Sequence, residues 1–312
     1  MDRETALRLY EVMLLTRLME ERLVKLFRQG RTMGSVYRSL GQEATACATA
    51  MALGPDDVIA PLIRNLGSMF VRGVTPREIF LQYLGRATGP TGGREHNNHF
   101  GSVERGIIAP TSMLGALIPV MAGVALSFRQ KGERRVAMTW IGDGGSSTGA
   151  FYEGLNFAVV QKLPLIVVGE ANGYAFSTPP ERQMPGKMAQ RSQGAFTMTV
   201  DGNDAAAVYA AAAEARQHCL EGKGPAFLVC ETFRMSGHAE HDDQRYVDPA
   251  LLAQWAEKDP LPRFVAWMVH RGWKTDNSLS ERLAARLEAA AESALKEPWP
   301  KADTLIQGVF SR

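Results

Sequence analysis

The chain has 312 residues, of which 45% are hydrophobic and 22% are charged, and its formal net charge is +2. A chain of this kind can bury a substantial core, and its nearly balanced charge gives no basic footprint of the sort that nucleic-acid binding requires. No apolar run reaches membrane-spanning length and the first residues do not form a basic-then-apolar signal peptide, so we expect a cytoplasmic protein that does not enter a membrane.

The amino-terminal part of the chain has the pattern of a helical region. Apolar residues recur at helical spacing over residues 4–29, and Gly30 is a typical helix stop. The run Gly41-Gln42-Glu43-Ala44 predicts the start of an Ala-rich helix, with acidic character that suits the helix dipole. A short strand over residues 58–60 and a helix over residues 74–87 are predicted to follow.

Two pairs of histidines share the spacing H-x-x-H, His96 with His99 and His238 with His241. Imidazole is a common zinc ligand, so a zinc site built from both pairs is one interpretation. The pairs lie in polar loops rather than on one face of a helix, which disfavours it. The cysteines give no zinc site either, because Cys47, Cys219 and Cys230 lack C-x-x-C spacing and are expected to be buried thiols.

The clearest pattern lies in the middle of the chain. Residues 136–141 and 165–168 are apolar runs typical of buried strands, and residues 151–159 between them have helical spacing. Such a strand–helix–strand unit makes parallel neighbours with a right-handed connection. Asp143 and Asn172 therefore follow the carboxyl ends of two parallel strands, where open α/β sheets bind ligands.

These two residues suit a metal and a phosphate group. A carboxylate and a carboxamide oxygen are ligands that Mg²⁺ accepts, together with substrate phosphates. Gly142 and Gly144 on either side of Asp143 allow backbone N–H groups to approach a phosphate closely. Asp143-Gly144 and Asn172-Gly173 are also ordinary turn dipeptides, so the pair alone does not decide between a turn and a site.

The remaining segments predict a loop, a strand and a helical end. Residues 176–196 combine Pro, Gly and basic residues without a hydrophobic period, which indicates a long loop that we interpret as a lid beside the site. Asp204 is predicted to cap an Ala-rich helix, and residues 226–230 to form another buried strand. Residues 247–312 predict a helical carboxyl-terminal extension. No repeat or linker interrupts the chain, so we expect a single domain over residues 1–312.

The spacing from Gly142-Asp143-Gly144 to Asn172 resembles the diphosphate-binding signature of thiamine diphosphate enzymes. Two other segments fit the same family: GQEA followed by an arginine, here Arg64, and a GHSxSD-like sequence that contains His238. From about Leu7 to Trp273 the chain resembles the alpha subunit of the decarboxylating first component of 2-oxo acid dehydrogenase complexes.

The resemblance implies an α/β thiamine diphosphate-binding fold, with a mostly parallel central sheet flanked by helices and with helical extensions over residues 1–30 and 247–312. It implies thiamine diphosphate and Mg²⁺ as cofactors. Asp143, Asn172 and the carbonyl of Tyr174 would bind the metal. Further residues carried over by the resemblance are Gly142, Gly144 and Arg64 for the diphosphate, Ser112 and Leu114 beside the aminopyrimidine ring, and His238 and His99 for proton transfer and orientation.

The chain departs from the family pattern around several of these positions. Ile63 and Leu66 stand where the family usually has an aromatic residue and a histidine beside the arginine, and Ala239 stands where it has a serine. The pair Arg245-Tyr246 is reversed and displaced relative to the usual aromatic–arginine pair. Ala116 and Leu117 replace two polar residues that hold a potassium ion in the branched-chain subgroup, so no potassium ion is predicted.

The resemblance also implies partners. The chain has one α/β domain where the family uses two, so a beta subunit is expected to complete the site in an alpha2beta2 heterotetramer. The reaction would be oxidative decarboxylation of a short 2-oxo acid, pyruvate or branched-chain, with acyl transfer to the lipoyl domain of the acyltransferase component. Alternatives are an acetoin dehydrogenase alpha subunit and a non-catalytic scaffold paralogue. A nicotinamide-dependent oxidoreductase is disfavoured because no glycine fingerprint follows the first strand.

Overall fold

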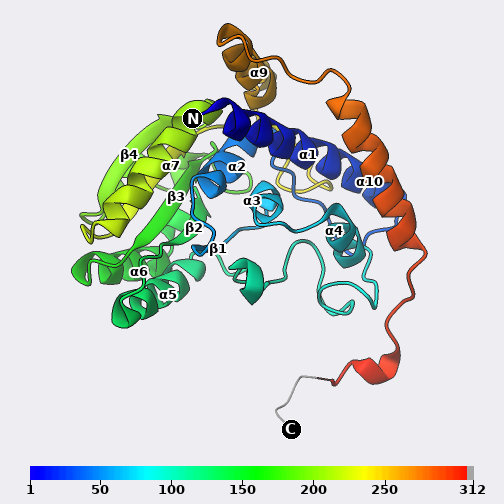
Figure 1. Cartoon of the computed structure of the whole chain (residues 1–312), viewed down its shortest axis with the longest axis horizontal. Coiled ribbons are helices and arrows are strands. Elements are labelled where there is room, and N and C mark those ends of the chain that lie inside the picture. Colours follow the sequence, from blue (N-terminus) through cyan, green and yellow to red (C-terminus); the bar gives the residue numbers. More distant parts are fainter. Residues whose placement is uncertain (308–312) are drawn as a thin grey trace.

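The computed structural model describes residues 1–307, and its centre is a five-stranded sheet in which every neighbouring pair of strands is parallel (Figure 1). The strand order is β1-β2-β3-β5-β4. Helices flank this sheet, so the α/β class that the sequence predicts is confirmed. The strands are β1 (Val58–Ala60), β2 (Ala137–Gly142), β3 (Leu165–Ala171), β4 (Phe196–Asp201) and β5 (Ala226–Glu231).

Both faces of the central strands are buried, which explains their continuous apolar runs. On β2, Met138 and Trp140 belong to the core that also contains side chains of α1, α2 and α7. Ala137 and Ile141 point to the opposite side and pack with α5 and α6. The helices before residue 221 are α1 (Arg3–Arg28), α2 (Glu43–Met51), α3 (Leu66–Val71), α4 (Pro76–Tyr83), α5 (Leu117–Lys131), α6 (Gly149–Val160) and α7 (Ala205–Leu220).

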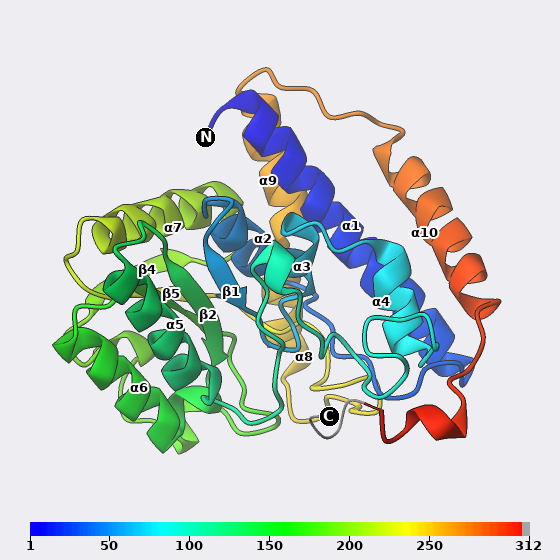
Figure 2. The same ribbon diagram turned by 60° about the horizontal axis from the view of Figure 1, so that its bottom comes forward.

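The carboxyl-terminal segment returns to the amino-terminal helix (Figure 2). It contains α8 (Pro249–Ala256), α9 (Pro260–His270) and α10 (Leu279–Leu295). Both α9 and α10 pack against α1, and α10 also packs against α4. The predicted extension over residues 247–312 thus contains helices, and its residues 308–312 lie outside the described part. The single-domain organisation stays a prediction.

Two expected features of the described residues can be compared directly with the structure. The three cysteines are free and buried, as predicted. No helix within residues 1–307 combines the length and the apolar character that a bilayer crossing requires.

The fourth helix is shorter than predicted. α4 ends at Tyr83 rather than at residue 87, because Gly85 has a φ of +62° and ends the helix. Thr75 caps the other end, where its hydroxyl accepts a hydrogen bond from the N–H of Glu78. The predicted cap at Asp204 is present, with its carboxylate accepting hydrogen bonds from the two N–H groups at positions 206 and 207.

One strand of the sheet was not predicted. Residues 196–201 form β4, which pairs with β5 and lies at the edge of the sheet. Phe196, Met198 and Val200 pack against the core, while Thr197 and Thr199 alternate with them. This period of two is the signal for a half-buried strand, and it was missed because the preceding residues have loop composition.

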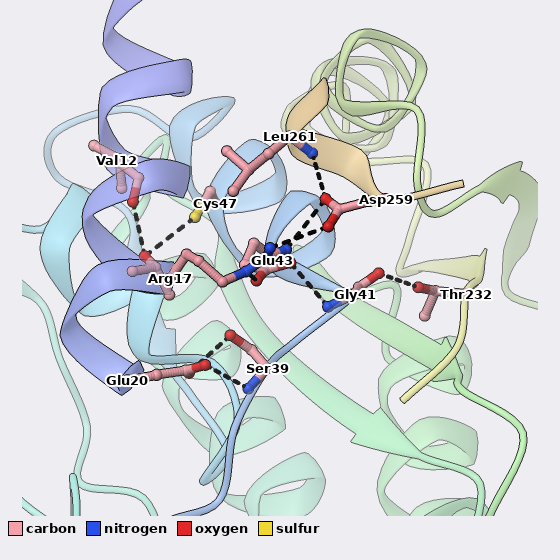
Figure 3. A network of polar contacts seen from close by, with 11 residues as sticks. Val12, Arg17, Glu20, Ser39, Gly41, Glu43, Cys47, Thr232, Asp259 and Leu261 are labelled. Carbon is pink, nitrogen blue, oxygen red and sulfur yellow. Dashed lines mark hydrogen bonds and ion pairs between the residues drawn. The ribbon is translucent and has the colours of Figure 1, made fainter. Parts of the chain in front are cut away.

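Glu20 is one of the charges along α1, yet it is buried, and Figure 3 shows it pointing toward Ser39. Its carboxylate accepts hydrogen bonds from the backbone N–H and the hydroxyl of Ser39, both at 2.8 Å. Within residues 1–307 it forms no ion pair, because Arg17 on the same helix binds Glu43 and Asp259 instead. Burial, followed by repulsion from Glu43, raises the pKa of Glu20 to about 8.

Replacing Glu20 by glutamine is expected to stabilise the chain increasingly as the pH rises. Between its ordinary pKa of 4.5 and about 8, the folded chain binds more protons at Glu20 than the unfolded chain does. The free energy of unfolding of the wild type therefore falls as the pH rises through this window, and Glu20→Gln escapes that loss. We expect the variant to gain about 2–4 kcal/mol on the wild type between pH 5 and pH 9.

Urea unfolding at the two pH values measures this gain. Glu21→Gln, at the exposed next residue, is the control and should show no such trend. A stability difference that is the same at both pH values would contradict the prediction.

Candidate active site

A cavity of about 660 Å³ opens at the carboxyl ends of β2 and β3. The ends of the two strands are adjacent because Gly142 pairs in register with Glu170. Every site residue taken from the sequence borders this one cavity, although these residues come from segments far apart in the chain. They are Arg64, His99, Ser112, Leu114, Gly142, Asp143, Gly144, Asn172, Tyr174 and His238.

Asp143 and Asn172 lie side by side on the cavity wall. One carboxylate oxygen of Asp143 accepts a hydrogen bond of 3.0 Å from the backbone N–H of Asn172, and the side chain forms no ion pair within residues 1–307. Burial raises the pKa of Asp143 to about 6, although hydrogen bonds from the N–H groups of Asn172 and Gly173 oppose this. The side-chain oxygen of Asn172 is buried and has no hydrogen-bond partner among the described residues. A buried carboxylate and an unpaired carboxamide oxygen are thus available to a cation.

The two glycines beside Asp143 have different surroundings. A Cβ atom built on Gly142 would meet nothing closer than the side-chain nitrogen of Asn172 at 4.0 Å. A Cβ atom on Gly144 would lie 2.9 Å from the Cβ atom of Ala175, so a side chain there would displace the wall. The backbone at Gly142 is therefore open, whereas Gly144 lacks a side chain at a point where Ala175 approaches closely.

Arg64 is buried at another part of the wall, on the turn before α3. Its Nη1 donates to the carbonyl of Arg38 at 2.9 Å, and its Nη2 donates to the carbonyl of His238 at 2.5 Å. No carboxylate within residues 1–307 forms an ion pair with it, and burial together with Arg234 lowers its pKa to about 10. A buried guanidinium without a carboxylate partner favours a bound anion.

His238 contacts the same guanidinium through its ring. Its Nδ1 lies 3.2 Å from Nη2 of Arg64. Because a guanidinium can only donate, Nδ1 accepts, and the neutral ring carries its proton on Nε2. Burial, then the positive charges of Arg64 and Arg234, lower the pKa of His238 to about 4. The imidazole is therefore neutral at pH 7 and can donate a hydrogen bond from Nε2.

Arg234 and Tyr246 support the loop that carries His238. Arg234 donates from Nη2 to the hydroxyl of Tyr246 at 2.5 Å and to the carbonyl of Phe176 at 2.7 Å. The hydroxyl of Tyr246 donates to Asp242 at 2.6 Å, and the same carboxylate accepts from the N–H of His238. Tyr246 thus has a defined contact, and its exposed neighbour at position 245 does not border the cavity.

His99 lies on the opposite loop and is partly exposed. Its Nδ1 is 3.7 Å from a carboxylate oxygen of Glu95, and its ring stacks on that of His96 at 6.5 Å between ring centres. Burial lowers the pKa of His99.

His241 contacts the hydroxyl of Ser35 at 3.2 Å instead of the cavity. Within residues 1–307 no three His, Cys, Asp or Glu side chains form a cluster that would hold a metal ion, which counts against zinc at the two histidine pairs.

The segment over residues 176–196 is only partly a loop. Phe176 borders the cavity and its ring lies 4.6 Å from that of His238, centre to centre. Arg191 is buried and donates from Nη1 to the carbonyl of Ser146, at 2.6 Å, next to the Gly142–Gly144 turn. The segment is therefore anchored at both ends to the site, and a lid motion stays a prediction.

Several residues of the wall were not among the predicted site residues. Tyr37 approaches His238 edge-on at 5.4 Å, and Glu170 lies between Thr45 and Asn65, from which it accepts hydrogen bonds of 2.6 and 2.8 Å. Burial raises the pKa of Glu170 to about 7. The signal that could have identified it is a lone carboxylate at the end of a buried apolar strand.

The positions that depart from the family pattern are accommodated by packing. Ile63 borders the cavity, whereas Leu66 and Ala239 are buried, with exposed fractions of 2% and 3%. Leu66 belongs to the main core beneath α1. Leu66, two residues after the arginine, is therefore a core residue.

Comparisons with known proteins show the family of this chain. The family model described as "Dehydrogenase E1 component" matches residues 10–303. The chain is 36% identical over 308 residues to the "Pyruvate dehydrogenase E1 component subunit alpha" of Bacillus subtilis (strain 168), covering 96% of this chain and 80% of that protein. It is 37% identical over 301 residues to the protein of the same name from Staphylococcus aureus (strain Mu50 / ATCC 700699), covering 93% of this chain and 78% of the relative. The chain thus belongs to the dehydrogenase E1 component family, as the alpha subunit of a 2-oxo acid dehydrogenase.

Proposed function

We propose that this chain, together with a beta subunit, catalyses thiamine diphosphate- and Mg²⁺-dependent oxidative decarboxylation of a short 2-oxo acid. The observation that carries the proposal is the pairing of opposite charges across one cavity. The carboxylate of Asp143 and the unpaired oxygen of Asn172 lie in the same cavity as Arg64, which has no carboxylate partner within residues 1–307. A magnesium diphosphate presents both a hard cation and an anion, so it matches both groups.

The residues of the wall fit such a group. Asp143 and Asn172 would hold the metal by their side chains, and the carbonyl of Tyr174 would be a third protein oxygen. The backbone at Gly142 and Gly144 would face the diphosphate, and Arg64 would balance its charge. Ser112 and Leu114 would border the aminopyrimidine end. When bound, the cofactor would supply a carbanion nucleophile for the 2-oxo carbon and an electron sink for the electron pair that is left behind when carbon dioxide departs.

His238 would act on the reacting oxygen through Nε2. Its ring is neutral, and its Nδ1 is already held by Arg64, so the proton on Nε2 is the one available to the cavity. Such a donor can stabilise an oxygen that gains negative charge during the reaction. His99, on the opposite loop, would orient the substrate or relay a proton, with Glu95 as its neighbour.

Exposed apolar side chains on the rim of the cavity favour contact with a second polypeptide. Met113 and Leu114 are apolar and have exposed fractions of 65% and 55%. Leu114 borders the cavity itself, so covering this rim would also close the site. Apolar groups exposed beside a cavity are typical of an interface. We therefore propose that a beta subunit covers this rim in an alpha2beta2 heterotetramer.

Pyruvate is the proposed substrate, because the relatives named above are pyruvate dehydrogenase subunits. The acyl group would then pass to a lipoyl domain of the acyltransferase component. A branched-chain 2-oxo acid and acetoin are the alternatives that a substrate screen of the assembled enzyme would separate. A cytoplasmic location stays a prediction.

The dependence on a beta subunit is expected to be absolute. The chain alone, the beta subunit alone and the co-expressed pair are each given pyruvate, thiamine diphosphate and Mg²⁺, and carbon dioxide release is measured with an artificial electron acceptor. Only the pair should turn over, because the chain supplies one of the two walls of the site. Decarboxylation of a 2-oxo acid by the purified chain alone would refute the proposal.

A further inference from the structure

The side-chain amide of Asn172 has a single hydrogen-bond partner among the described residues. Its Nδ2 donates to Oε1 of Gln42 at 3.1 Å, and its oxygen is left unpaired and buried. The main chain of Asn172 is fixed on both sides, since its N–H donates to Asp143 and its carbonyl accepts from the N–H of Arg234. Because the backbone of Asn172 is fixed, the hydrogen bond to Gln42 decides whether the oxygen or the nitrogen of the Asn172 amide points away from Gln42.

Gln42 has a firmly held backbone. Its side chain is buried, with an exposed fraction of 1%. Its N–H donates to the carbonyl of Ser39 at 2.8 Å, and its carbonyl accepts from the N–H and the hydroxyl of Thr45. The preceding residue, Gly41, has a φ of +90°, and a Cβ atom there would lie 2.8 Å from the carbonyl oxygen of Phe233.

The turn is also anchored to the amino-terminal helix (Figure 3). The N–H of Gly41 donates to the carboxylate of Glu43 at 3.1 Å, and Arg17 binds the other oxygen of that carboxylate. Arg17 in turn holds Asp259 through two hydrogen bonds of 3.0 and 3.2 Å. The backbone of Gln42 therefore does not follow the movements of a surface loop. Its side-chain Oε1 accepts from Nδ2 of Asn172, and its Nε2 is buried without a hydrogen-bond partner within residues 1–307.

We propose that Gln42 is a positioning residue that holds the carboxamide of Asn172 with its oxygen turned toward the metal site. The proposal rests on the assignment of Asn172 as a metal ligand under the proposed function. An amide that turns by 180° presents a nitrogen with two hydrogens, which repels a cation instead of ligating it. By accepting from Nδ2, Gln42 favours the ligating orientation before the metal arrives, in the way that outer partners orient metal ligands.

The test uses Mn²⁺ as the probe in place of Mg²⁺, with thiamine diphosphate present, and the full chain co-expressed with its beta subunit. Electron paramagnetic resonance measures free and bound Mn²⁺. Gln42→Met removes the acceptor with little change in shape, and Gln42→Glu keeps an oxygen at that place. Gln82→Met is the matched control, because Gln82 is an equally buried glutamine on α4 that does not border the cavity.

Gln42→Met is expected to weaken Mn²⁺ binding about 10–100-fold, the usual loss for an outer partner of a metal ligand. Gln42→Glu should bind Mn²⁺ nearly as the wild type does, and so should Gln82→Met. Urea unfolding should give the opposite order in stability. Gln42→Glu should be less stable than Gln42→Met, because it adds a buried carboxylate. A merely structural role for Gln42 would make both readouts follow the same order.

The proposal is overturned if Mn²⁺ affinity falls in parallel with stability, so that Gln42→Glu binds worse than Gln42→Met. It is also overturned if Gln42→Met binds like the wild type while Asn172→Ala, measured alongside, binds poorly. If Asn172→Ala also binds like the wild type, Asn172 is not a ligand, and the metal assignment of the proposed function fails together with the role of Gln42.

Discussion

Asp143→Ala is expected to abolish metal-dependent binding of thiamine diphosphate. Removing only the outer partner of a metal ligand costs about 10–100-fold in affinity, so removing the ligand itself should cost at least about 100-fold. The carboxylate of Asp143 is buried, and Glu170, another acid that borders the same cavity, already accepts hydrogen bonds from Thr45 and Asn65 and is not expected to replace it. Calorimetric titration of thiamine diphosphate into the co-expressed alpha–beta assembly, with and without Mg²⁺, measures the effect.

The control for this variant is Asp201→Ala. Asp201 is the last residue of β4, so the same change is made at the end of another strand of the sheet, away from the cavity. Its binding should match the wild type. Binding by Asp143→Ala that still depends on Mg²⁺ would place the metal elsewhere, and no binding by the intact assembly would favour the scaffold paralogue.

The pH should affect the same measurement. The pKa of Asp143 is raised to about 6 in the absence of metal, so protons compete with the cation as the pH falls through this value. Apparent Mg²⁺ affinity is therefore expected to be constant above about pH 7 and to fall below about pH 6. Asp201→Ala should keep this dependence.

His238→Ala is expected to cut acyl transfer to the lipoyl group by about 100-fold or more, within the range that a positioned proton donor contributes. Cofactor binding should remain nearly intact, because Arg64 keeps its hydrogen bonds to the backbone carbonyls of Arg38 and of residue 238. Steady-state rates with a lipoyl acceptor and calorimetric binding of thiamine diphosphate, measured on the same preparation, separate the two effects.

His241→Ala is the matched control, since it removes the second histidine of the same H-x-x-H pair and does not touch the cavity. The wild-type rate should show no loss from protonation of His238 until the pH approaches about 4, because its pKa is lowered to that value. Normal turnover by His238→Ala would remove this residue from the proposed mechanism.

The position of the site could be predicted because parallel strands place their carboxyl ends together. Two apolar runs joined by a helical pattern were enough to bring Asp143 and Asn172 side by side, and the structure gives this register directly. The order of the family motifs then assigned Arg64 and His238 to the same site. These two lie 174 positions apart and yet share a hydrogen bond, and only the resemblance to a known family related them.

Other features required the packed structure. The edge strand β4 has only the weak signal of a half-buried strand, and it follows a segment with loop composition. Glu20 has the sequence context of a solvated charge, and its burial depends on Ser39 from a different element. The support of His238 by Tyr246 depends on a loop conformation that spacing does not determine. Each case involves a tertiary contact that overrides the local pattern.

The bond between Arg17 and Asp259 has a consequence for how the protein is made. It joins residues 242 positions apart and anchors the helix that begins the chain to one near its end. A ribosome adding about 5–20 residues per second needs roughly 10–50 s to travel from one partner to the other. The last strand of the sheet, β5, ends at Glu231, so all five strands have been made before Asp259, while the guanidinium that steadies the Gly41-Gln42 turn still lacks this partner. Cofactor capture is therefore expected to be a late event of biosynthesis, after α9 has left the ribosome.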